Sequence, residues 1–401
     1  MSRRQARGPR RRGADHIRTR AARWRGRLAL AALAVVAAGS ASAAASPPAG
    51  WPTFGIYRLA RGGLASVFVN QGYLRVLEYG NGEYRALRKQ SPGVWVGGPG
   101  ATVFSPVSVR LQVLGTGRVA VDGQTGTLIP LTDRPVGFSD GSVHFTGRVL
   151  LPAGPGPFPG VVIVPGSERA NRWTYDLWAY FYAAHGFAVL TYDKRGVKGS
   201  GGIYSASAST ANLQLLASDA VAALNALRRE PQIAATRVGL AGASQAGWVI
   251  EMATARSSAV SFAVLQSAPA MSVGRQLAYQ FITNSGRVDP PPTDTQIQTA
   301  LSGKPDSGYN PRSDIASLQI PVLWQLGAVD RRMYTPETVS DLQQITASGG
   351  HAFTVDVYPG GAHSLRMTAN GLISEERSSP GFCPGVFPDL AAWLQSRVLA
   401  R

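Results

Sequence analysis

The sequence of 401 residues contains a single cysteine, Cys383. One thiol cannot form an internal disulfide, and no cysteine–histidine cluster has the spacing of a zinc site. No apolar run reaches the roughly 20 residues that an ordinary membrane-spanning helix needs. Disulfide scaffolds, zinc modules and multi-spanning membrane proteins are therefore excluded. We predict a protein that is stabilised by its core and requires no metal or organic cofactor.

Acidic residues are scarce beside basic ones: 23 Asp and Glu stand against 40 Lys and Arg. Much of the excess lies in residues 1–27, which hold eleven arginines and one acid. A short apolar run at 28–38 follows, and then small residues with A-x-A sites near 41–45. This arrangement is typical of a secretory signal peptide over residues 1–45, with the mature protein periplasmic or secreted. The alternatives are an uncleaved membrane anchor and a nucleic-acid-binding tail. We expect neither a nucleic-acid partner nor stable membrane insertion.

Residues 51–140 consist of short apolar or alternating runs separated by glycine pairs and Asn-Gly or Asp-Gly turns. The runs 64–70 and 73–79, the second followed by Gly-Asn-Gly at 80–82, are examples. Such spacing is typical of antiparallel β-hairpins. We predict a small β-rich N-terminal module over residues 50–140, whose residues indicate no chemistry of their own.

From residue 141 onward, unbroken apolar runs alternate with segments of helical periodicity. This pattern is typical of a parallel sheet covered by helices on both faces. The predicted fold class for residues 141–401 is therefore α/β with a mostly parallel sheet. The expected strands are 143–151, 161–164, 187–192, 238–241, 261–265, 322–326 and 353–358, and the expected helices are 173–184, 211–229, 245–255, 336–346 and 387–399.

The alternation breaks between residues 268 and 318, where Pro290-Pro-Pro292 and several glycines interrupt the chain. Helical segments are expected at 273–284 and 294–302. We predict that this insertion forms a helical lid over the carboxyl edge of the sheet. The alternative is a long surface connection.

The segment Gly242-Ala-Ser244-Gln-Ala246-Gly247 directly follows an apolar strand and opens a helix. In a nucleophile elbow, the serine lies on a tight strand-to-helix turn that raises its hydroxyl above the sheet. Small residues must flank that turn because the helix passes close to the strand. Gly242 meets this need, whereas Ala246 stands where a second glycine is usual. We predict that Ser244 is a nucleophile; the alternative is a serine that only caps the helix.

A serine hydroxyl needs an adjacent base. The candidates are the histidines that follow the predicted signal peptide. His144 falls inside a strand, His185 at a helix end, and His351 at a strand start, the wrong edge of a parallel sheet. His363 follows the last strand at its carboxyl end, where catalytic groups gather in such sheets. His363 is therefore the predicted base, and a surface-loop histidine is the alternative.

Asp330 is the predicted third member of a catalytic triad. It follows the preceding strand at its carboxyl end, whereas Asp341 and Asp356 lie inside a helix and a strand. An aspartate in this position orients the imidazole and stabilises it when it is protonated. The chain order serine, aspartate, histidine is that of α/β-hydrolases and not of chymotrypsin or subtilisin.

Acyl transfer through a tetrahedral intermediate also requires N–H donors for the oxyanion. The first predicted donor is the backbone N–H of Gln245, directly after the nucleophile. The second is that of Ser167, in the loop after strand 161–164, because Gly166 provides the turn. Tentative substrate-binding residues are Glu168, Trp173 and Trp248. For Glu168, a structural role at the rim of the pocket is equally consistent with the sequence.

Together these stretches resemble the secreted branch of the α/β-hydrolase superfamily related to dienelactone hydrolases and prolyl-oligopeptidase-like esterases. The resemblance implies an α/β-hydrolase fold, and its loop Asp193-Lys-Arg-Gly196 is interpreted as structural and not catalytic. There are two departures from the pattern: Ala246 in the elbow, and Pro165 where a histidine often precedes the oxyanion glycine. The matching stretches are 145–152, 159–167, 192–196, 199–200, 242–247, 320–323, 327–330 and 360–363.

These residues predict a serine hydrolase that cleaves carboxylic esters of small molecules through an acyl-enzyme intermediate. A peptidase or an acyltransferase on the same triad is an alternative, because the pocket and water access decide the acceptor. A catalytically silent secreted binding protein is another. The presence of all three triad residue types favours an enzyme. The sequence makes no prediction about oligomeric state.

Overall fold

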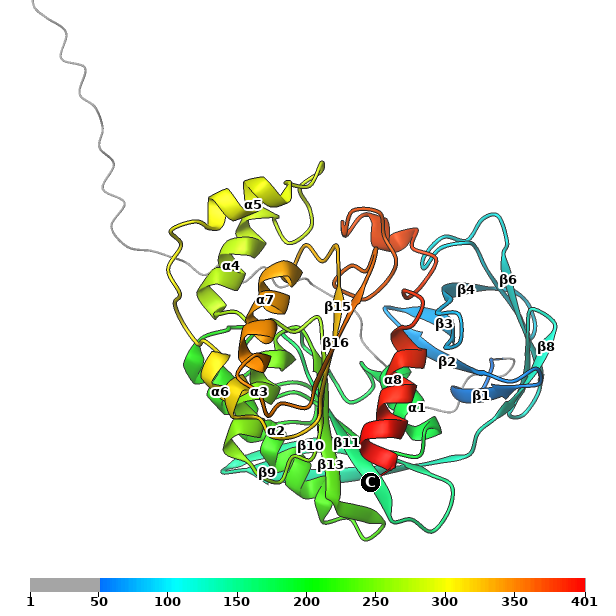
Figure 1. Cartoon of the computed structure of the whole chain (residues 1–401). Helices are drawn as coiled ribbons and strands as arrows, with labels where there is room; N and C mark the ends of the chain where they lie inside the picture. Colours follow the sequence, from blue (N-terminus) through cyan, green and yellow to red (C-terminus); the bar gives the residue numbers. More distant parts are fainter. Residues whose placement is uncertain (1–50, 401) are drawn as a thin grey trace, which may run out of the picture. The chain divides into compact units, whose positions relative to one another are not determined.

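Two β-sheets organise residues 51–400, the part of the chain that the computed structural model describes (Figure 1). The predicted signal peptide, residues 1–45, lies outside the described residues. Within residues 51–400, no helix is long and apolar enough to cross a bilayer.

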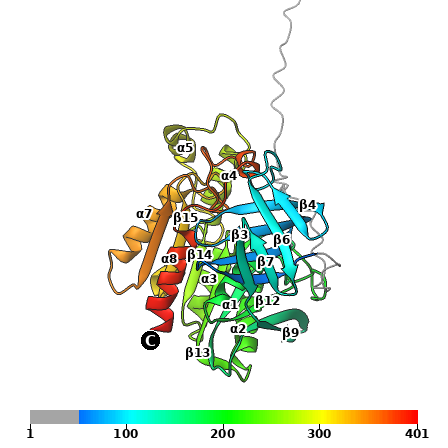
Figure 2. The same ribbon diagram turned by 90° about the vertical axis from the view of Figure 1, so that its right-hand side faces the viewer.

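The first sheet is a closed barrel of eight antiparallel strands (Figure 2). The barrel closes where β1 pairs with β8, for example Tyr57 with Leu128. Because successive side chains of a strand point to opposite faces, one set of alternating residues from all eight strands fills the interior. The strands are Gly55–Leu59 (β1), Leu64–Asn70 (β2), Tyr73–Glu78 (β3), Tyr84–Ser91 (β4), Val94–Gly97 (β5), Val109–Gly115 (β6), Arg118–Val121 (β7) and Gln124–Leu128 (β8).

The second sheet has eight strands in the order β16-β15-β14-β13-β11-β12-β10-β9. Neighbours from β12 to β16 are parallel, whereas β10 is antiparallel to both β9 and β12. The predicted mostly parallel sheet is thus confirmed. Its strands are Leu131–Asp140 (β9), Val143–Pro152 (β10), Phe158–Val164 (β11), Ala188–Tyr192 (β12), Ile233–Ala243 (β13), Ala263–Gln266 (β14), Val322–Gly327 (β15) and Phe353–Tyr358 (β16).

The chain passes from barrel to sheet at Ile129 and Pro130, ahead of the boundary near residue 140 that the sequence suggested. Strand β9 pairs with β10 along ten residues, joined by a tight turn at Gly141, and has no barrel partner. Its alternating pattern resembles that of the barrel strands because β9 is an edge strand. Only the pairing of β9 with β10 shows that β9 belongs to the second sheet and not to the barrel.

Helices cover both faces of the second sheet, as predicted (Figure 1). One face packs against α1 and α8, together with barrel residues such as Phe68 and Leu77. The other face packs against α2, α3, α6 and α7. These helices are Asp176–Ala184 (α1), Thr210–Arg228 (α2), Ala246–Arg256 (α3), Arg312–Ser317 (α6), Thr335–Thr346 (α7) and Val386–Leu394 (α8), the last continued by a π-helical turn at Gln395–Leu399.

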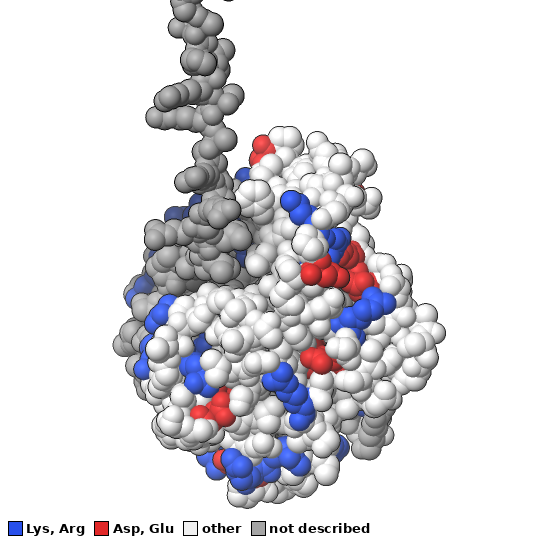
Figure 3. All heavy atoms as spheres, turned by 90° about the vertical axis from the view of Figure 1, so that its left-hand side faces the viewer, with Lys and Arg blue, Asp and Glu red and all other residues white. Residues whose placement is uncertain are grey.

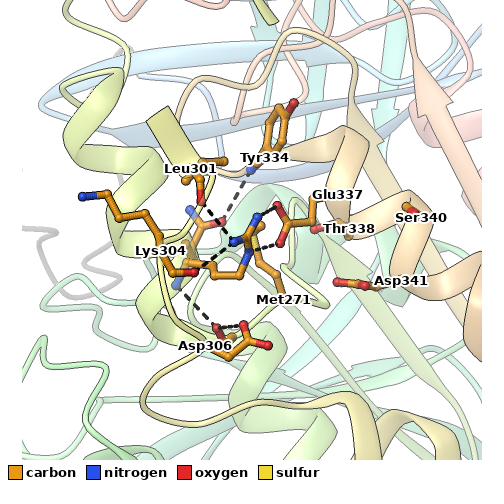
Figure 4. A network of polar contacts seen from close by, with 12 residues as sticks. Met271, Leu301, Lys304, Asp306, Tyr334, Glu337, Thr338, Ser340 and Asp341 are labelled. Atoms are coloured by element: carbon orange, nitrogen blue, oxygen red, sulfur yellow. Dashed lines mark hydrogen bonds and ion pairs between the residues drawn. The ribbon is translucent and has the colours of Figure 1, made fainter. Parts of the chain in front are cut away.

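The insertion at 268–318 contains Val273–Ile282 (α4), Asp294–Leu301 (α5) and α6. Arg275 of α4 forms an ion pair with Glu337 of α7 and donates to the carbonyls of Leu301 and Lys304 (Figure 4). Figure 3 shows acidic and basic side chains side by side at the upper right of this face of the molecule. The insertion is therefore held to α7 by the ion pairs Arg275–Glu337 and Arg312–Asp341, as well as by apolar packing.

Candidate active site

The predicted site residues lie at one edge of the second sheet, where the strands β11, β13, β15 and β16 end. Ser244 follows β13, and the loop 165–167 follows β11. Asp330 and His363 follow β15 and β16. Because these strands are parallel, all four segments emerge at the same edge, which is where ligands bind in sheets of this kind.

Ser244 occupies the strained turn expected of a nucleophile elbow. Its φ of 60° is in the left-handed region, and its N–H donates to the carbonyl of Gln266 at 3.0 Å. A Cβ built on Gly242 would lie 2.7 Å from the Cβ of Ala246 and 2.9 Å from the carbonyl oxygen of Val164. A Cβ on Gly247 would collide with Ala268. Ala246 is thus accommodated because Gly242 lacks a side chain, and the second glycine stands one position later, where Ala268 approaches.

Asp330 and His363 form a hydrogen-bonded pair. The Nδ1 of His363 lies 2.7 Å from the Oδ2 of Asp330, whose side chain is fully buried. The other carboxylate oxygen, Oδ1, accepts from the backbone N–H groups of Arg332 and Met333 at 2.7 and 2.9 Å. Both oxygens of Asp330 therefore have fixed partners, and within residues 51–400 no hydrogen bond occupies the Nε2 of His363, which can accept a proton.

Helix α4 of the insertion fixes the backbone that carries Asp330. The hydroxyl of Tyr279 donates to the carbonyl of Asp330 at 2.7 Å, and that of Thr283 to the carbonyl of Arg331 at 2.6 Å. The side-chain amides of Gln276 and Gln280 donate to the next carbonyl, that of Arg332. Three consecutive carbonyls of this loop thus accept from one helix.

The loop after β11 leaves the Ser167 N–H available. The N–H of Gly166 donates to the hydroxyl of Tyr175 at 2.9 Å, and this hydroxyl donates to the carboxylate of Glu168. By contrast, neither the Ser167 N–H nor that of Gln245 donates to any group within residues 51–400. Both N–H groups are therefore unoccupied within residues 51–400, and their role as oxyanion donors stays a prediction.

Lys194 is a residue of the site whose role the sequence analysis missed. It is 1% exposed, and its Nζ donates to the carbonyl of Gly166 and, at 3.4 Å, to the Oε1 of Gln245. The ammonium also lies 5.5 Å from the centre of the Tyr204 ring. Burial lowers the pKa of Lys194 to about 8. Lys194 thus connects the two segments whose N–H groups are the predicted oxyanion donors.

The residues on either side of Lys194 make ion pairs that hold their loop. Asp193 pairs with Arg172 through both carboxylate oxygens, at 3.2 and 2.8 Å. Arg195 pairs with the buried Asp219. The ion pairs of Asp193 and Arg195 agree with the predicted structural role of loop 193–196. Lys194 differs, because it also contacts the two segments that carry the predicted oxyanion donors. One feature of the sequence could have indicated this role. Lys194 closely follows the buried strand β12, at the sheet edge where Ser244 also lies.

The tentative substrate-binding residues have different surroundings. The carboxylate of Glu168 is bonded to Tyr175 and lies over Gly166, so it braces the oxyanion loop. Trp173 is half-buried, with the guanidinium of Arg172 4.8 Å from its ring centre. Trp248 is 4% exposed in the core, and its indole N–H donates to the carbonyl of Met271 at 3.1 Å. Trp248 thus belongs to the core, whereas Glu168 and Trp173 lie in the segment between β11 and α1.

Two hollows lie near the supporting segments and include none of the predicted site residues. One, of about 220 Å³, is lined by charged residues of the insertion and α7, among them Arg275 and Asp306. The other, of about 490 Å³, is lined by residues such as Leu372 and Ile373. Within residues 51–400, no group of three or more His, Cys, Asp or Glu side chains has the arrangement of a metal site.

The family described as the prolyl oligopeptidase family matches residues 173–386, which is more than half of the chain. A comparison with curated protein sequences finds no match. Similar solved structures include an acylaminoacyl peptidase from Pyrococcus horikoshii, with 15% identity, a TM-score of 0.50, and coverage of 85% of this chain and 56% of that one.

An esterase from Pyrococcus furiosus has 15% identity and a TM-score of 0.47, over 67% of this chain and 92% of that one. A dienelactone hydrolase-like promiscuous phosphotriesterase from metagenomic libraries has 18% identity and a TM-score of 0.44, over 67% and 98%. The family match covers the segment that carries Ser244, Asp330 and His363. With the α/β-hydrolase fold confirmed, the chain belongs to the prolyl oligopeptidase family and is a hydrolase.

Proposed function

We propose that this hydrolase cleaves carboxylic esters with Ser244 as nucleophile, His363 as general base and Asp330 as the group that orients His363. The observation that carries the proposal is the Asp330–His363 pair at 2.7 Å, on the same sheet edge as a serine held at a φ of 60°. A serine in a strained elbow beside a histidine–aspartate pair is the arrangement that activates a hydroxyl for acyl transfer.

In the proposed reaction, each of the three residues has one role. The Oγ of Ser244 attacks the ester carbonyl while the Nε2 of His363 takes its proton. Asp330 accepts from the Nδ1–H of His363, which fixes the tautomer and stabilises the imidazolium that forms. The proton then passes to the leaving alcohol, and the bond from the acyl carbon to the alkoxy oxygen breaks. Water, deprotonated in turn by His363, releases the acid from Ser244.

The backbone N–H groups of Gln245 and Ser167 are the proposed oxyanion donors. Each has no partner among the described residues. Removal of one such donor usually costs about 10²–10³-fold in kcat in enzymes of this kind. Lys194 contacts Gly166 and Gln245 and thereby holds the spacing between the two donors.

A carboxylic ester is the substrate class that the site supports best, because the alcohol that His363 protonates is a good leaving group. An amide has a poorer leaving group, and a peptidase must also hold an extended chain in register. A peptidase is the second candidate, since the matching family is described as prolyl oligopeptidase. Both candidates use the same three residues.

The test is the hydrolysis of short-chain nitrophenyl esters by the purified protein and by its Ser244→Ala variant. We expect turnover to fall by about 10⁴-fold or more in the variant, because the nucleophile is lost. Ser142→Ala, at an exposed hairpin turn, is the matched control and should keep full activity. Unchanged ester turnover in Ser244→Ala would contradict the proposal.

A second measurement separates the esterase from the peptidase. The same acyl group is presented as a nitrophenyl ester and as a nitroanilide, with aminoacyl and peptidyl anilides included. An esterase should show kcat/KM for the ester far above that for the matched anilide. Efficient cleavage of peptidyl anilides, lost in Ser244→Ala, would favour the peptidase.

A further inference from the structure

The segment from Ser364 to Gly385 joins His363 to α8 and runs toward the barrel strands β3 and β4 (Figure 1). It is long for a connection in a compact domain, where most run to about 4–6 residues. Segments of this length with little regular structure need other contacts to remain ordered. Its backbone hydrogen bonds show where these contacts are.

A ladder of three antiparallel β-bridges leads from the barrel to the residues just before His363. Glu83 in the turn between β3 and β4 pairs with Gly381, Phe382 pairs with Arg366, and Met367 pairs with Gly361. Each step is made by short backbone hydrogen bonds. The bonds are Phe382 N–H to Gly82 O at 2.8 Å, Met367 N–H to Gly381 O at 2.8 Å, Cys383 N–H to Leu365 O at 2.9 Å and Ala362 N–H to Arg366 O at 3.0 Å.

A second set of contacts holds the same segment to the loop after β5. The N–H of Ala101 donates to the carbonyl of Ser379, and that of Thr102 to the carbonyl of Arg377, each at 2.9 Å. The guanidinium of Arg85 in β4 donates to the carbonyl of Pro380. The barrel and its loops therefore hold this segment throughout residues 377–382.

The interior of this contact is buried and closely packed. Ala101, Leu365, Phe382 and Cys383 are all at most 7% exposed. The rings of Phe382 and Tyr84 pack edge to face, with their centres 5.8 Å apart. Buried backbone groups that lose their partners are costly, so the ladder is a stiff connection.

We propose that the barrel is a positioning element for His363: the β3–β4 turn sets the place of the histidine through the bridge ladder. This inference rests on the proposed function, in which His363 is the base. A misplacement of about 1 Å in a reacting group can cost about 10²-fold in rate. A disturbance at the ladder should therefore lower kcat, while substrate affinity stays the same.

The turns of the barrel offer a matched pair of variants. Gly82 has a φ of 75°, and a Cβ built on it would lie 2.7 Å from the carbonyl oxygen of Phe382. Gly72, in the β2–β3 turn, has a φ of 77°, and its Cβ would meet nothing within 4 Å. Gly82→Ala and Gly72→Ala thus carry the same backbone strain, but only Gly82→Ala pushes on the ladder.

The experiment measures kcat and KM for a nitrophenyl ester, the rate of Ser244 labelling by a fluorophosphonate, and Tm. For Gly82→Ala we expect kcat and the labelling rate to fall about tenfold or more with KM within about twofold of wild type. Gly72→Ala should keep both rates within about twofold of wild type. Equal rates in the two variants would overturn the inference. So would a raised KM with unchanged kcat, because the barrel would then contribute to substrate binding.

If Gly82→Ala does not fold, a second pair in strand β4 replaces it. Arg85→Met removes the contact to Pro380, whereas Arg88→Met changes an exposed arginine of the same strand. A loss of kcat confined to Arg85→Met supports the inference, and equal kcat in both contradicts it. The proposed function fails separately, if ester turnover survives in Ser244→Ala.

Discussion

The two halves of the proposed active site are supported by different parts of the chain. The nucleophile half contains Ser244 and the predicted donors Gln245 and Ser167, and it is held within the sheet edge by close approaches of small residues and by Lys194. The acid–base half contains Asp330 and His363. It is held from outside the sheet, by α4 on one loop and by the barrel on the other.

The kinds of contact differ as well. Helix α4 holds the Asp330 loop through side chains that donate to carbonyls, so each contact can be removed by a single substitution. The barrel holds the His363 loop mainly through backbone pairs, which only a steric change can break. Substitutions around Asp330 should therefore lower kcat in small steps, one contact at a time. A steric change in the bridge ladder should lower kcat in one step.

Asp330→Asn should produce the largest effect, a loss of about 10⁴-fold in kcat. The side-chain oxygen of the new asparagine would still accept from the N–H groups of Arg332 and Met333, so its amide nitrogen would face the Nδ1 of His363. The amide donates to Nδ1 and forces the proton onto Nε2, which then cannot accept from Ser244. Asp341→Asn, at a partly exposed position of α7, is the control, and kcat on the nitrophenyl ester is the measurement. Comparable losses in the two variants would argue against this role for Asp330.

Lys194→Met tests the nucleophile half, and we expect kcat to fall by about 10- to 100-fold. Methionine fills a similar volume but cannot donate to Gly166 and Gln245, so the spacing of the two oxyanion donors is no longer fixed. Lys89→Met, which replaces an exposed lysine of the barrel, should leave kcat unchanged. Activity equal to that of Lys89→Met would show that Lys194 is only a packing residue.

The pH dependence of the same variant sharpens this test. Burial lowers the pKa of Lys194 from 10.5 to about 8, so the wild type should lose activity above that pH as the ammonium loses its proton. Stability should change in the opposite direction. The unfolded chain keeps this proton up to about pH 10.5, so between pH 8 and 10.5 it binds more protons than the folded chain, and the free energy of unfolding rises with pH. Both effects should be missing in Lys194→Met, as shown by kcat/KM and denaturant unfolding across this range.

Tyr279→Phe should give the smallest effect on activity, a fall of about threefold in kcat, because Thr283, Gln276 and Gln280 still hold the neighbouring carbonyls. The buried carbonyl of Asp330 loses its donor, which should lower the free energy of unfolding by about 1–3 kcal/mol. Tyr309→Phe, in the same insertion but bonded to Asp314, is the control and should leave kcat unchanged. A loss as large as that of Asp330→Asn would mean that the Asp330 loop depends on this one bond.

Much of the fold could be predicted because the strands and helices of the second sheet carry regular apolar patterns. The expected strand 322–326 is found as Val322–Gly327, and the expected helix 336–346 as Thr335–Thr346. Strand β13 begins at Ile233, ahead of its apolar run at 238–241, because Ile233 pairs with Phe158 across an irregularity in the register. No local pattern indicates such a pairing.

The candidate site, like the fold, could be predicted only in part. The places of Ser244, Asp330 and His363 follow from strand ends, and the structure puts all three at the predicted edge, although their roles stay predictions. The supports of the acid–base half could not be predicted, since Tyr279 is 51 residues from Asp330 and Gly82 is far from Phe382 in the sequence. The sequence indicates only a loop residue at Lys194, because its burial depends on Gly166 and Gln245 from other loops.

The short connection between the barrel and the second sheet also limits how the two can move relative to each other. Rigid-body opening requires a hinge, a few residues whose φ and ψ can change freely. Between Leu128 and Leu131 there are only Ile129, whose N–H is bonded to the carbonyl of Ile56, and Pro130, whose ring fixes φ. A swing of the barrel would have to break these constraints and the bridge ladder together. We therefore expect any motion that accompanies substrate binding to be confined to smaller segments, on the faster timescale of loops and not that of domains.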